Sequence, residues 1–431
     1  MSKAKRTPAT REVLTSAERR TLAALAEGFV PGGGAARARA AERAFSTVVD
    51  PELVRQLRLV LRLIETRAGS LLIGGRAARF SSLRGDARDA YLQHWVQHRI
   101  PLMRSAASAL RKLLCFLAYA DADEPDDQRT RARLTSIGYN PKPNAATRDR
   151  SPLVAFDPQQ ARRIAVDVLV IGSGAGGGAV ARDLARAGKR VMVIEAGALY
   201  DERSFPTRER DAYERLYLDS GFTATDDAHI AILAGGTVGG GTTVNWMTSI
   251  PVPDRVRAEW EERHGVTGIA SPRFKQDLNE VLREVGAQPA ESTPPKDAAL
   301  LRGAAGRGWS GEPIRINRAE CGDCGTCPFG CKRGSKQSTL RLHLPEALAA
   351  GAHLIPDCKA ERLIIEHGAV HGAVTTYGTR AGSPRTLEIV APQVVVSGGA
   401  LRTPLLLRRS GLTHPAIGQN LRLHPVTLAA G

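Results

Sequence analysis

Two groups of residues in this chain have the types and the spacing that cofactor chemistry needs. The first is a glycine fingerprint, Gly172, Gly174 and Gly177, with Glu195 lying 23 residues after its first glycine. Gly172 permits a tight turn, Gly174 lets the backbone approach a pyrophosphate, and Gly177 lets the next helix pack closely on the preceding strand. An acid at this distance accepts hydrogen bonds from ribose hydroxyls. The pattern predicts a dinucleotide site, and a glycine-rich loop of no special role is the alternative.

A second glycine cluster follows, with five glycines in the seven residues 235–241. Such a run cannot form the interior of a stable helix or strand, and it permits close approach of the backbone to a ligand. We expect Gly239 and Gly240 to contact the cofactor, with Asn245 offering an amide beside the loop and Trp246 next to it. A flexible surface loop is the alternative.

The second group is a run of four cysteines, Cys321, Cys324, Cys327 and Cys331. Its spacing, C-x2-C-x2-C-x3-C, is typical of bacterial ferredoxins that hold a [4Fe–4S] cluster, but the second set of cysteines found in those proteins is absent here. Zinc would use the same thiolates. A thiol-rich loop without metal is the third alternative, and no residue is assigned as a metal ligand.

Regular elements must hold these groups in place. The apolar run 166–171 is typical of a buried parallel strand, and residues 178–187 and 191–194 predict the helix and the second strand of the nucleotide-binding unit. Further strands are expected over 363–366, 370–377 and 387–397. The charged region 254–313 is helix-prone and resembles an insertion or the start of a second domain.

Residues 1–150 differ from the rest of the chain in composition and pattern. Thr15 or Ser16 can cap a first helix, and further helices are expected from Asp50 to Ile64, over 84–98 and over 102–119, before a linker at 140–144. This part holds 27 Lys and Arg against 15 Asp and Glu, so it carries most of the net charge of +16. Because no aromatic residues interleave with the basic ones, the pattern indicates a solvated helical surface and not a nucleic-acid site.

The bulk properties exclude several classes of protein. The 431 residues are enough for two or three domains, and 42% hydrophobic residues can form real cores. No apolar run approaches the 18–20 residues, roughly, of a membrane-spanning helix, and the N-terminus lacks the apolar core of a signal peptide. We therefore expect a cytoplasmic protein, with peripheral membrane contact as an open alternative.

Four segments in order resemble the glucose–methanol–choline (GMC) family of flavoprotein oxidoreductases. They are the fingerprint with Glu195, the loop 238–246, the segment 394–407 and the segment 417–425. The resemblance covers most of residues 165–431 and implies FAD as the cofactor. In some members a histidine of the second loop holds the flavin covalently. The aligned residue here is Val244, so the resemblance implies non-covalent FAD.

The fold class implied is α/β: a Rossmann-like FAD-binding domain of GMC type with an N-terminal all-helical extension and an incomplete substrate domain. The expected parts are the helical extension at 1–150, the FAD-binding domain at 160–255 and 314–417, an insertion or cap at 256–313, and the start of a truncated substrate domain at 418–431.

Within the family the chain most resembles the long-chain alcohol oxidases, through its helical extension and its cysteine segment followed by Lys336-Gln-Ser-Thr. The extension also resembles the small subunit of gluconate dehydrogenases. The resemblance implies an alcohol substrate whose CH–OH group is oxidised by hydride transfer to the flavin. The alternatives are a flavin-binding fragment or subunit that needs a partner chain, and an iron–sulfur flavoprotein dehydrogenase.

No catalytic residue is assigned from the sequence. In relatives the base is a histidine of a C-terminal segment, which we expect beyond residue 431. His229 has no partner that the sequence identifies. The other candidates are expected to be structural: His343, His353, His367, His371 and His424.

Overall fold

The computed structural model describes residues 13–47, 51–120, 128–139, 153–226, 230–380 and 382–426. The chain forms two compact units. The helical unit comprises Met1–Asn140, Thr207–Glu214 and Leu218–Leu233, and the sheet unit comprises Pro141–Pro206, Arg215–Tyr217 and Ala234–Gly431. The expected linker at 140–144 lies outside the described residues. Among those residues, no helix has both the length and the apolar character needed to cross a bilayer.

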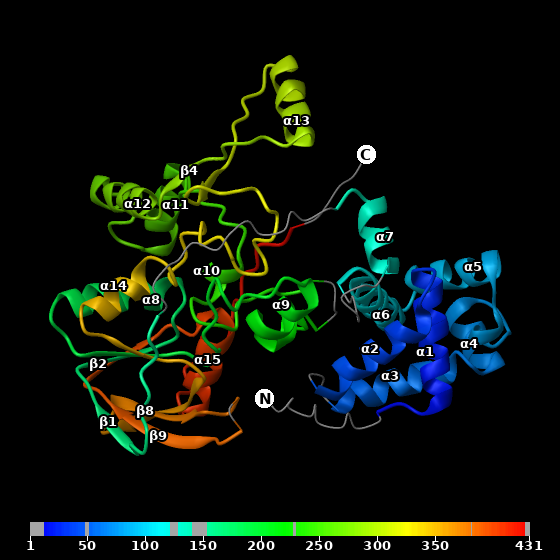
Figure 1. Ribbon diagram of the computed structural model, residues 1–431, viewed down its shortest axis with the longest axis horizontal. Coiled ribbons are helices and arrows are strands. Elements are labelled where there is room, and N and C mark those ends of the chain that lie inside the picture. The colour runs from blue at the N-terminus through cyan, green and yellow to red at the C-terminus, as the bar shows by residue number, and fades with distance from the viewer. Residues whose placement is uncertain are drawn as a thin grey trace, which may run out of the picture. The chain divides into compact units, whose positions relative to one another are not determined.

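Helices alone build most of the helical unit (Figure 1). In chain order they are α1 (Ser16–Phe29), α2 (Gly34–Thr47), α3 (Pro51–Leu63), α4 (Arg67–Gly74), the 3-10 turn η1 (Phe80–Ser82), α5 (Gly85–Val96), α6 (Pro101–Ala120) and α7 (Gln128–Ser136). The helices expected around α1, α3, α5 and α6 are confirmed. Helices α2, α4 and α7 were not predicted from the sequence.

The start of α1 shows why this part of the chain folds as expected. Thr15 caps the helix: its hydroxyl accepts a hydrogen bond from the Glu18 amide, and the Glu18 carboxylate accepts one from the Thr15 amide. The apolar side of α1 then places Leu22 and Leu25 in a core that also holds Trp95 of α5. Burial of these side chains is the main stabilising contribution to the unit.

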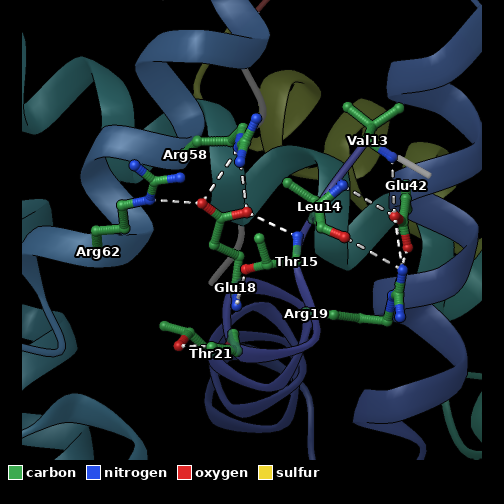
Figure 2. Close-up of polar contacts among 10 residues, drawn as sticks. Val13, Leu14, Thr15, Glu18, Arg19, Thr21, Glu42, Arg58 and Arg62 are labelled. Carbon is green, nitrogen blue, oxygen red and sulfur yellow. Dashed lines mark hydrogen bonds and ion pairs between the residues drawn. The ribbon is translucent and has the colours of Figure 1, made fainter.

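Two carboxylates inside this unit form ion pairs with arginines of neighbouring helices (Figure 2). Glu18 is 3% exposed and accepts from Arg58 Nε at 3.1 Å and from Arg62 Nε at 2.7 Å, both on α3. Burial alone would raise the pKa of Glu18. The hydrogen bonds from the Thr15 amide, Arg62 and Arg58 outweigh burial and lower that pKa. Glu42 of α2 pairs in the same way with Arg19 at 2.6 Å. These pairs join α1 to α2 and α3.

A parallel four-stranded sheet forms the centre of the sheet unit. Its strands run in the order β10 (Gln393–Val396), β2 (Val168–Ile171), β3 (Val191–Ile194) and β6 (His353–Ile355). Every residue of β2 and β3 is buried. One side of these strands joins the core shared with the second sheet, and α8 (Ala175–Arg186) packs on the strands as well (Figure 1). This two-sided burial explains the uninterrupted apolar runs.

A second sheet lies against this one, with strand order β1-β9-β8-β7. Its strands are β1 (Arg163–Ala165), β7 (Cys358–Glu366), β8 (Ala369–Tyr377) and β9 (Arg385–Val390). Strand β1 pairs in parallel with β9, while β7, β8 and β9 are antiparallel. Arg163 of β1 is opposite Glu388, and Val168 of β2 is opposite Gln393 in the parallel sheet.

The single strand expected over 387–397 is wrong. The chain leaves β9 at Val390, passes through Ala391 and Pro392, and enters β10 in the other sheet. Pro392 has no amide hydrogen and so cannot continue a ladder. The helix expected over 178–187 is confirmed in type, but α8 begins three residues earlier, at Ala175.

The expected insertion at 256–313 contains mostly helices. It holds most of α11 (Asp254–His264), then α12 (Pro272–Glu284) and α13 (Pro295–Gly306), and β4 (Ala287–Pro289) pairs with β5 (Arg315–Asn317). The remaining elements are α9 (Glu209–Leu216), η2 (Leu218–Gly221), α10 (Gly241–Val244), α14 (His343–Ala349) and α15 (Gly399–Arg409).

The buried carboxylate of Glu18 leads to a testable expectation. Replacing Glu18 by Gln removes a charge that two arginines and a helix cap share, and we expect a loss of about 1–3 kcal/mol in the unfolding free energy of the helical unit. Because the folded-state pKa of Glu18 is lowered, this contribution is present above the unfolded pKa and is lost as the pH falls through the folded pKa.

Urea unfolding of the full chain, followed by far-UV circular dichroism at pH 7 and at acid pH, measures the effect. The control is Glu52→Gln, which breaks an exposed pair with Arg55 on α3 and should change little. Equal unfolding curves for the two variants at pH 7 would contradict the role given to Glu18.

Candidate functional site

The carboxyl ends of three parallel strands meet at the glycine fingerprint. Gly172 follows β2, Glu195 follows β3 and Ser397 follows β10. Gly172 has a φ of 104°, and a Cβ there would lie 2.5 Å from the Ser397 carbonyl oxygen. Only glycine fits this turn. The edge at the carboxyl ends of a parallel sheet is where α/β folds bind their ligands.

Helix α8 begins at this edge with an open N-terminus. Its N-cap residue is Gly174, which supplies no side-chain cap, and the next two residues, Ala175 and Gly176, are exposed. A Cβ at Gly177 would lie 1.9 Å from the Gly172 carbonyl oxygen, so helix and turn are in backbone contact. The uncapped amides of the first turn are therefore free to bind phosphate oxygens. This geometry fits a dinucleotide.

Glu195 is held in place by the fingerprint itself. Its Oε2 accepts from the Ser173 amide at 3.0 Å and from the Ser173 hydroxyl at 2.7 Å, while its Oε1 accepts from the Gly197 amide at 3.0 Å. Each carboxylate oxygen has further acceptor capacity, so the carboxylate can also take ribose hydroxyls. Ser173 is fully buried, and the sequence reasoning had not singled it out.

The second glycine loop lies against the first. The Gly239 amide donates to the Ser173 hydroxyl at 3.0 Å, and a Cβ on Gly240 would lie 2.9 Å from Gly174 Cα. Both Gly239 and Gly240 have positive φ. The two glycine segments, 66 residues apart in sequence at this hydrogen bond, thus form one backbone-lined site.

The other two expected contact residues follow the short helix α10. Asn245 is exposed, and its side-chain oxygen accepts from the Met247 amide at 3.2 Å. The Trp246 side chain is 63% exposed. Within the described residues, neither side chain forms a hydrogen bond with the fingerprint. The preceding residue, Val244, is buried. The structure therefore brings Gly239 and Gly240 to the fingerprint and leaves Asn245 and Trp246 on the surface beside it.

Lys336 and Thr339, which follow the cysteine segment in the chain, hold the second glycine loop in place through hydrogen bonds. Thr339 shares a hydrogen bond with Thr242 at 3.0 Å, and its hydroxyl donates to the Ser173 carbonyl at 3.2 Å. Lys336 is 2% exposed, and its ammonium donates to the carbonyls of Thr243, Asn245 and Cys327. Burial lowers the pKa of Lys336 to about 8. The motif Lys336-Gln-Ser-Thr is the sequence feature that marks both residues, but in the sequence it indicates only a resemblance to a family and not these hydrogen bonds.

The cysteine segment does not form a metal centre within the described residues. All four of its cysteines are free and partly exposed, and no group of three or more His, Cys, Asp or Glu side chains is placed to hold a metal ion there. Burial raises the pKa of the Cys327 thiol to about 11, which keeps that sulfur protonated at neutral pH. The geometry therefore favours neither the iron–sulfur nor the zinc interpretation.

The histidines show no catalytic arrangement in the described part of the chain. His343 is buried, and its Nε2 lies 3.0 Å from Glu284 Oε1 of α12. Burial lowers the pKa of His343. His353 packs on Phe156, His424 is exposed, and His229 lies outside the described residues.

Residues 213–426 match the family model described as GMC oxidoreductase. The chain carries a GMC oxidoreductase domain. GMC oxidoreductases bind FAD, and the open N-terminus of α8 and the meeting of the two glycine segments fit such a cofactor.

Two relatives are similar to this chain over most of its length. A long-chain-alcohol oxidase of Arabidopsis thaliana is 30% identical over 420 residues, which cover 87% of this chain and 56% of the relative. An uncharacterised GMC-type oxidoreductase of Mycobacterium tuberculosis (strain ATCC 25618 / H37Rv) is 35% identical over 387 residues, or 86% of this chain and 57% of the relative. The chain thus spans little more than half the length of these GMC relatives.

Among solved structures, pyridoxine 4-oxidase from Mesorbium loti superposes on 57% of this chain and 52% of its own, with a TM-score of 0.44 and 19% identity.

Ser173 provides a test of how the GMC site is held together. Replacing Ser173 by Ala leaves the buried Gly239 amide without its acceptor and removes a donor from Glu195, so we expect thermal unfolding of the cofactor-free protein to show a loss of about 1–3 kcal/mol. Ser204→Ala is the matched control, because Ser204 is exposed and its hydroxyl, among the residues that the structure describes, bonds only with Asp201. A Ser173→Ala protein that melts like the control would show that the hydroxyl does not connect the two glycine segments.

Proposed function

We propose that this chain binds FAD non-covalently at the joined glycine segments and serves the oxidation of a CH–OH group, with a long-chain alcohol as substrate. One observation carries the proposal: the backbone of Gly240 approaches that of Gly174 beside the open N-terminus of α8, with Ser173 and Glu195 hydrogen-bonded at the carboxyl ends of β2 and β3. The similarity to long-chain-alcohol oxidases supports the choice of substrate.

Each part of the site has a separate task in this proposal. The amides of the first turn of α8 bind the pyrophosphate, which the positive end of the helix dipole also stabilises. Glu195, fixed by Ser173 and Gly197, accepts from the adenosine ribose. Gly239 and Gly240 hold the second loop close enough for backbone contact, and Asn245 and Trp246 lie at the edge where the flavin ring is expected. Val244 has no side-chain atom that could bond covalently to the cofactor.

When bound, FAD supplies the two-electron acceptor for the hydride of the alcohol carbon. In this proposal the chain's own residues bind the cofactor and orient it. The base that takes the hydroxyl proton is not among the residues that we assign.

Reconstitution tests the proposal directly. The purified chain, incubated with FAD and desalted, should retain flavin absorbance and should melt at a higher temperature than without FAD. Under anaerobic conditions, 1-dodecanol should bleach the bound flavin faster than ethanol does. Protein that retains no flavin and shows no thermal shift would contradict the cofactor assignment, and bleaching by neither alcohol would contradict the assigned activity of this chain.

A second candidate function is a flavin-binding subunit that acts with a partner chain. Several large apolar side chains of the sheet unit are exposed between residues 246 and 314, and they suit an interface. They include Trp246, Ile250, Leu300 and Trp309, which are between 63% and 72% exposed. Alcohol-dependent bleaching by the chain alone would contradict this alternative.

Two adjacent glycines give a matched pair of variants. A Cβ at Gly177 would overlap the Gly172 carbonyl oxygen, whereas a Cβ at Gly176 meets nothing within 4 Å. We therefore expect Gly177→Ala to lower FAD affinity roughly tenfold or more and to destabilise the fold, because the helix must move off the strand. Gly176→Ala should keep both properties. Calorimetric titration with FAD and thermal melting measure the pair, and equal FAD affinities would contradict the role of close helix packing.

A further inference from the structure

The ammonium group of Lys336 connects two segments that are distant in sequence. It donates to the carbonyl oxygens of Thr243 at 2.7 Å and Asn245 at 2.8 Å, at the end of α10, and to that of Cys327 at 2.8 Å, in the cysteine segment. An ammonium has three N–H donors, so all three are used. The two segments are 91 and 9 residues away from Lys336 along the chain.

The surroundings make this connection strong. Lys336 is 2% exposed and forms no ion pair within the described residues, so its charge is compensated by carbonyl dipoles. The thiols of Cys327 and Cys331 lie near it, and Glu202 and Arg341, which share a small cavity with it, form a buried ion pair with each other. Hydrogen bonds to a buried charged donor are stronger than those between neutral groups.

The three carbonyls belong to segments of different character. Thr243 and Asn245 end the second glycine loop, whose first residues contact the fingerprint through Ser173 and Gly174. Glycines at positions 239, 240 and 241 leave that loop with little intrinsic rigidity. The end of the loop therefore needs an external tie if the backbone at Gly239 and Gly240 is to stay in place. Thr339 holds the middle of the loop at Thr242, and Lys336 ties the end of the loop to Cys327 of the cysteine segment.

We propose that Lys336 is a positioning residue that clamps the second glycine loop in its cofactor-binding geometry, and that the cysteine segment serves as the anchor of this clamp through the Cys327 carbonyl. The inference rests on the proposed function, because it takes this loop to contact FAD. It assigns to the cysteine segment a task that needs no metal: the Cys327 carbonyl oxygen, and not a sulfur atom, accepts the hydrogen bond from Lys336.

Two substitutions of Lys336 separate the contribution of its donors from that of its bulk. Lys336→Met keeps an unbranched apolar chain and removes every donor, whereas Lys336→Gln keeps two N–H donors without the charge. We expect the FAD dissociation constant to rise roughly tenfold or more in the Met variant, and by less in the Gln variant. Lys332→Met is the matched control, since Lys332 is a partly exposed lysine four residues earlier whose side chain forms no hydrogen bond with the described residues.

A measurement on the cofactor-free protein tests the clamp independently of FAD binding. Hydrogen exchange of the cofactor-free full chain reports on the amides of Thr243 and Asn245, which donate to Gly240 and Gly241 and not to Lys336. Their exchange should be faster in Lys336→Met than in the wild-type protein or Lys332→Met, while the amides of β2 and β3 stay protected. A general loss of structure would instead raise exchange in those strands as well.

The outcomes distinguish the clamp from the proposed function. Wild-type protein that binds no FAD would overturn the proposed function, and the exchange experiment would still decide whether Lys336 fixes the loop. Unchanged exchange at Thr243 and Asn245 in the Met variant would overturn the clamp. An FAD affinity within about twofold of wild type in a folded Met variant would overturn the positioning role, as would equal losses in the Met variant and the Lys332 control. Faster exchange throughout β2 and β3 would also overturn it, because Lys336 would then support the whole fold.

Discussion

The site depends on the approach of two stretches of backbone that leave no room for a Cβ on Gly240. Gly174, at the start of α8, and Gly240, in the second loop, are in contact, and the buried hydroxyl of Ser173 joins both segments to Glu195. A side chain at Gly240 would push the second loop away from Gly174 and so separate it from the helix N-terminus and the carboxylate. The parallel sheet holds one of the segments rigidly because β2 is buried on both faces, whereas the other is a glycine loop that must be fixed by contacts from elsewhere.

The sequence predicted the parts of this arrangement that have local causes. The run into Gly172, the helix after it and Glu195 at the end of β3 follow from strand patterning and from the spacing of a known turn, and the GMC domain confirms the fold class. Ser173 and Lys336 escaped prediction for a physical reason. Each acts through tertiary contacts to segments tens of residues away, and the neighbouring residues do not show which distant segments these contacts join. The cysteine spacing left three interpretations open, because a regular pattern of ligands does not by itself show whether the backbone places the sulfur atoms to hold a metal ion. In the described residues no group of ligands with that arrangement is formed.

In the helical unit, too, sequence patterns predicted some elements and missed others. Helices with broad apolar faces, such as α3 and α6, were predicted, but α2 buries mainly alanines at positions 38, 40 and 41, which give little contrast between its faces. The buried carboxylates of Glu18 and Glu42 were equally hidden from pattern reasoning, because charged residues on a helix are usually solvated. Their partners, Arg58, Arg62 and Arg19, come from neighbouring helices and explain part of the high arginine content.

The two sheets of the sheet unit share one pairing offset. Arg163 is opposite Glu388 and Val168 is opposite Gln393, so partners are 225 positions apart in both sheets, and two-residue connections lead from β1 to β2 and from β9 to β10. The two strand pairs are thus one parallel ladder bent at a single point. A one-residue insertion or deletion in either connection would shift one pair against the other and exchange the two faces of β2 or β10, so that each side chain would meet packing partners of the opposite face. Changes of length in this family of sequences should therefore be excluded from 166–167 and 391–392, while the loops around the insertion helices can vary.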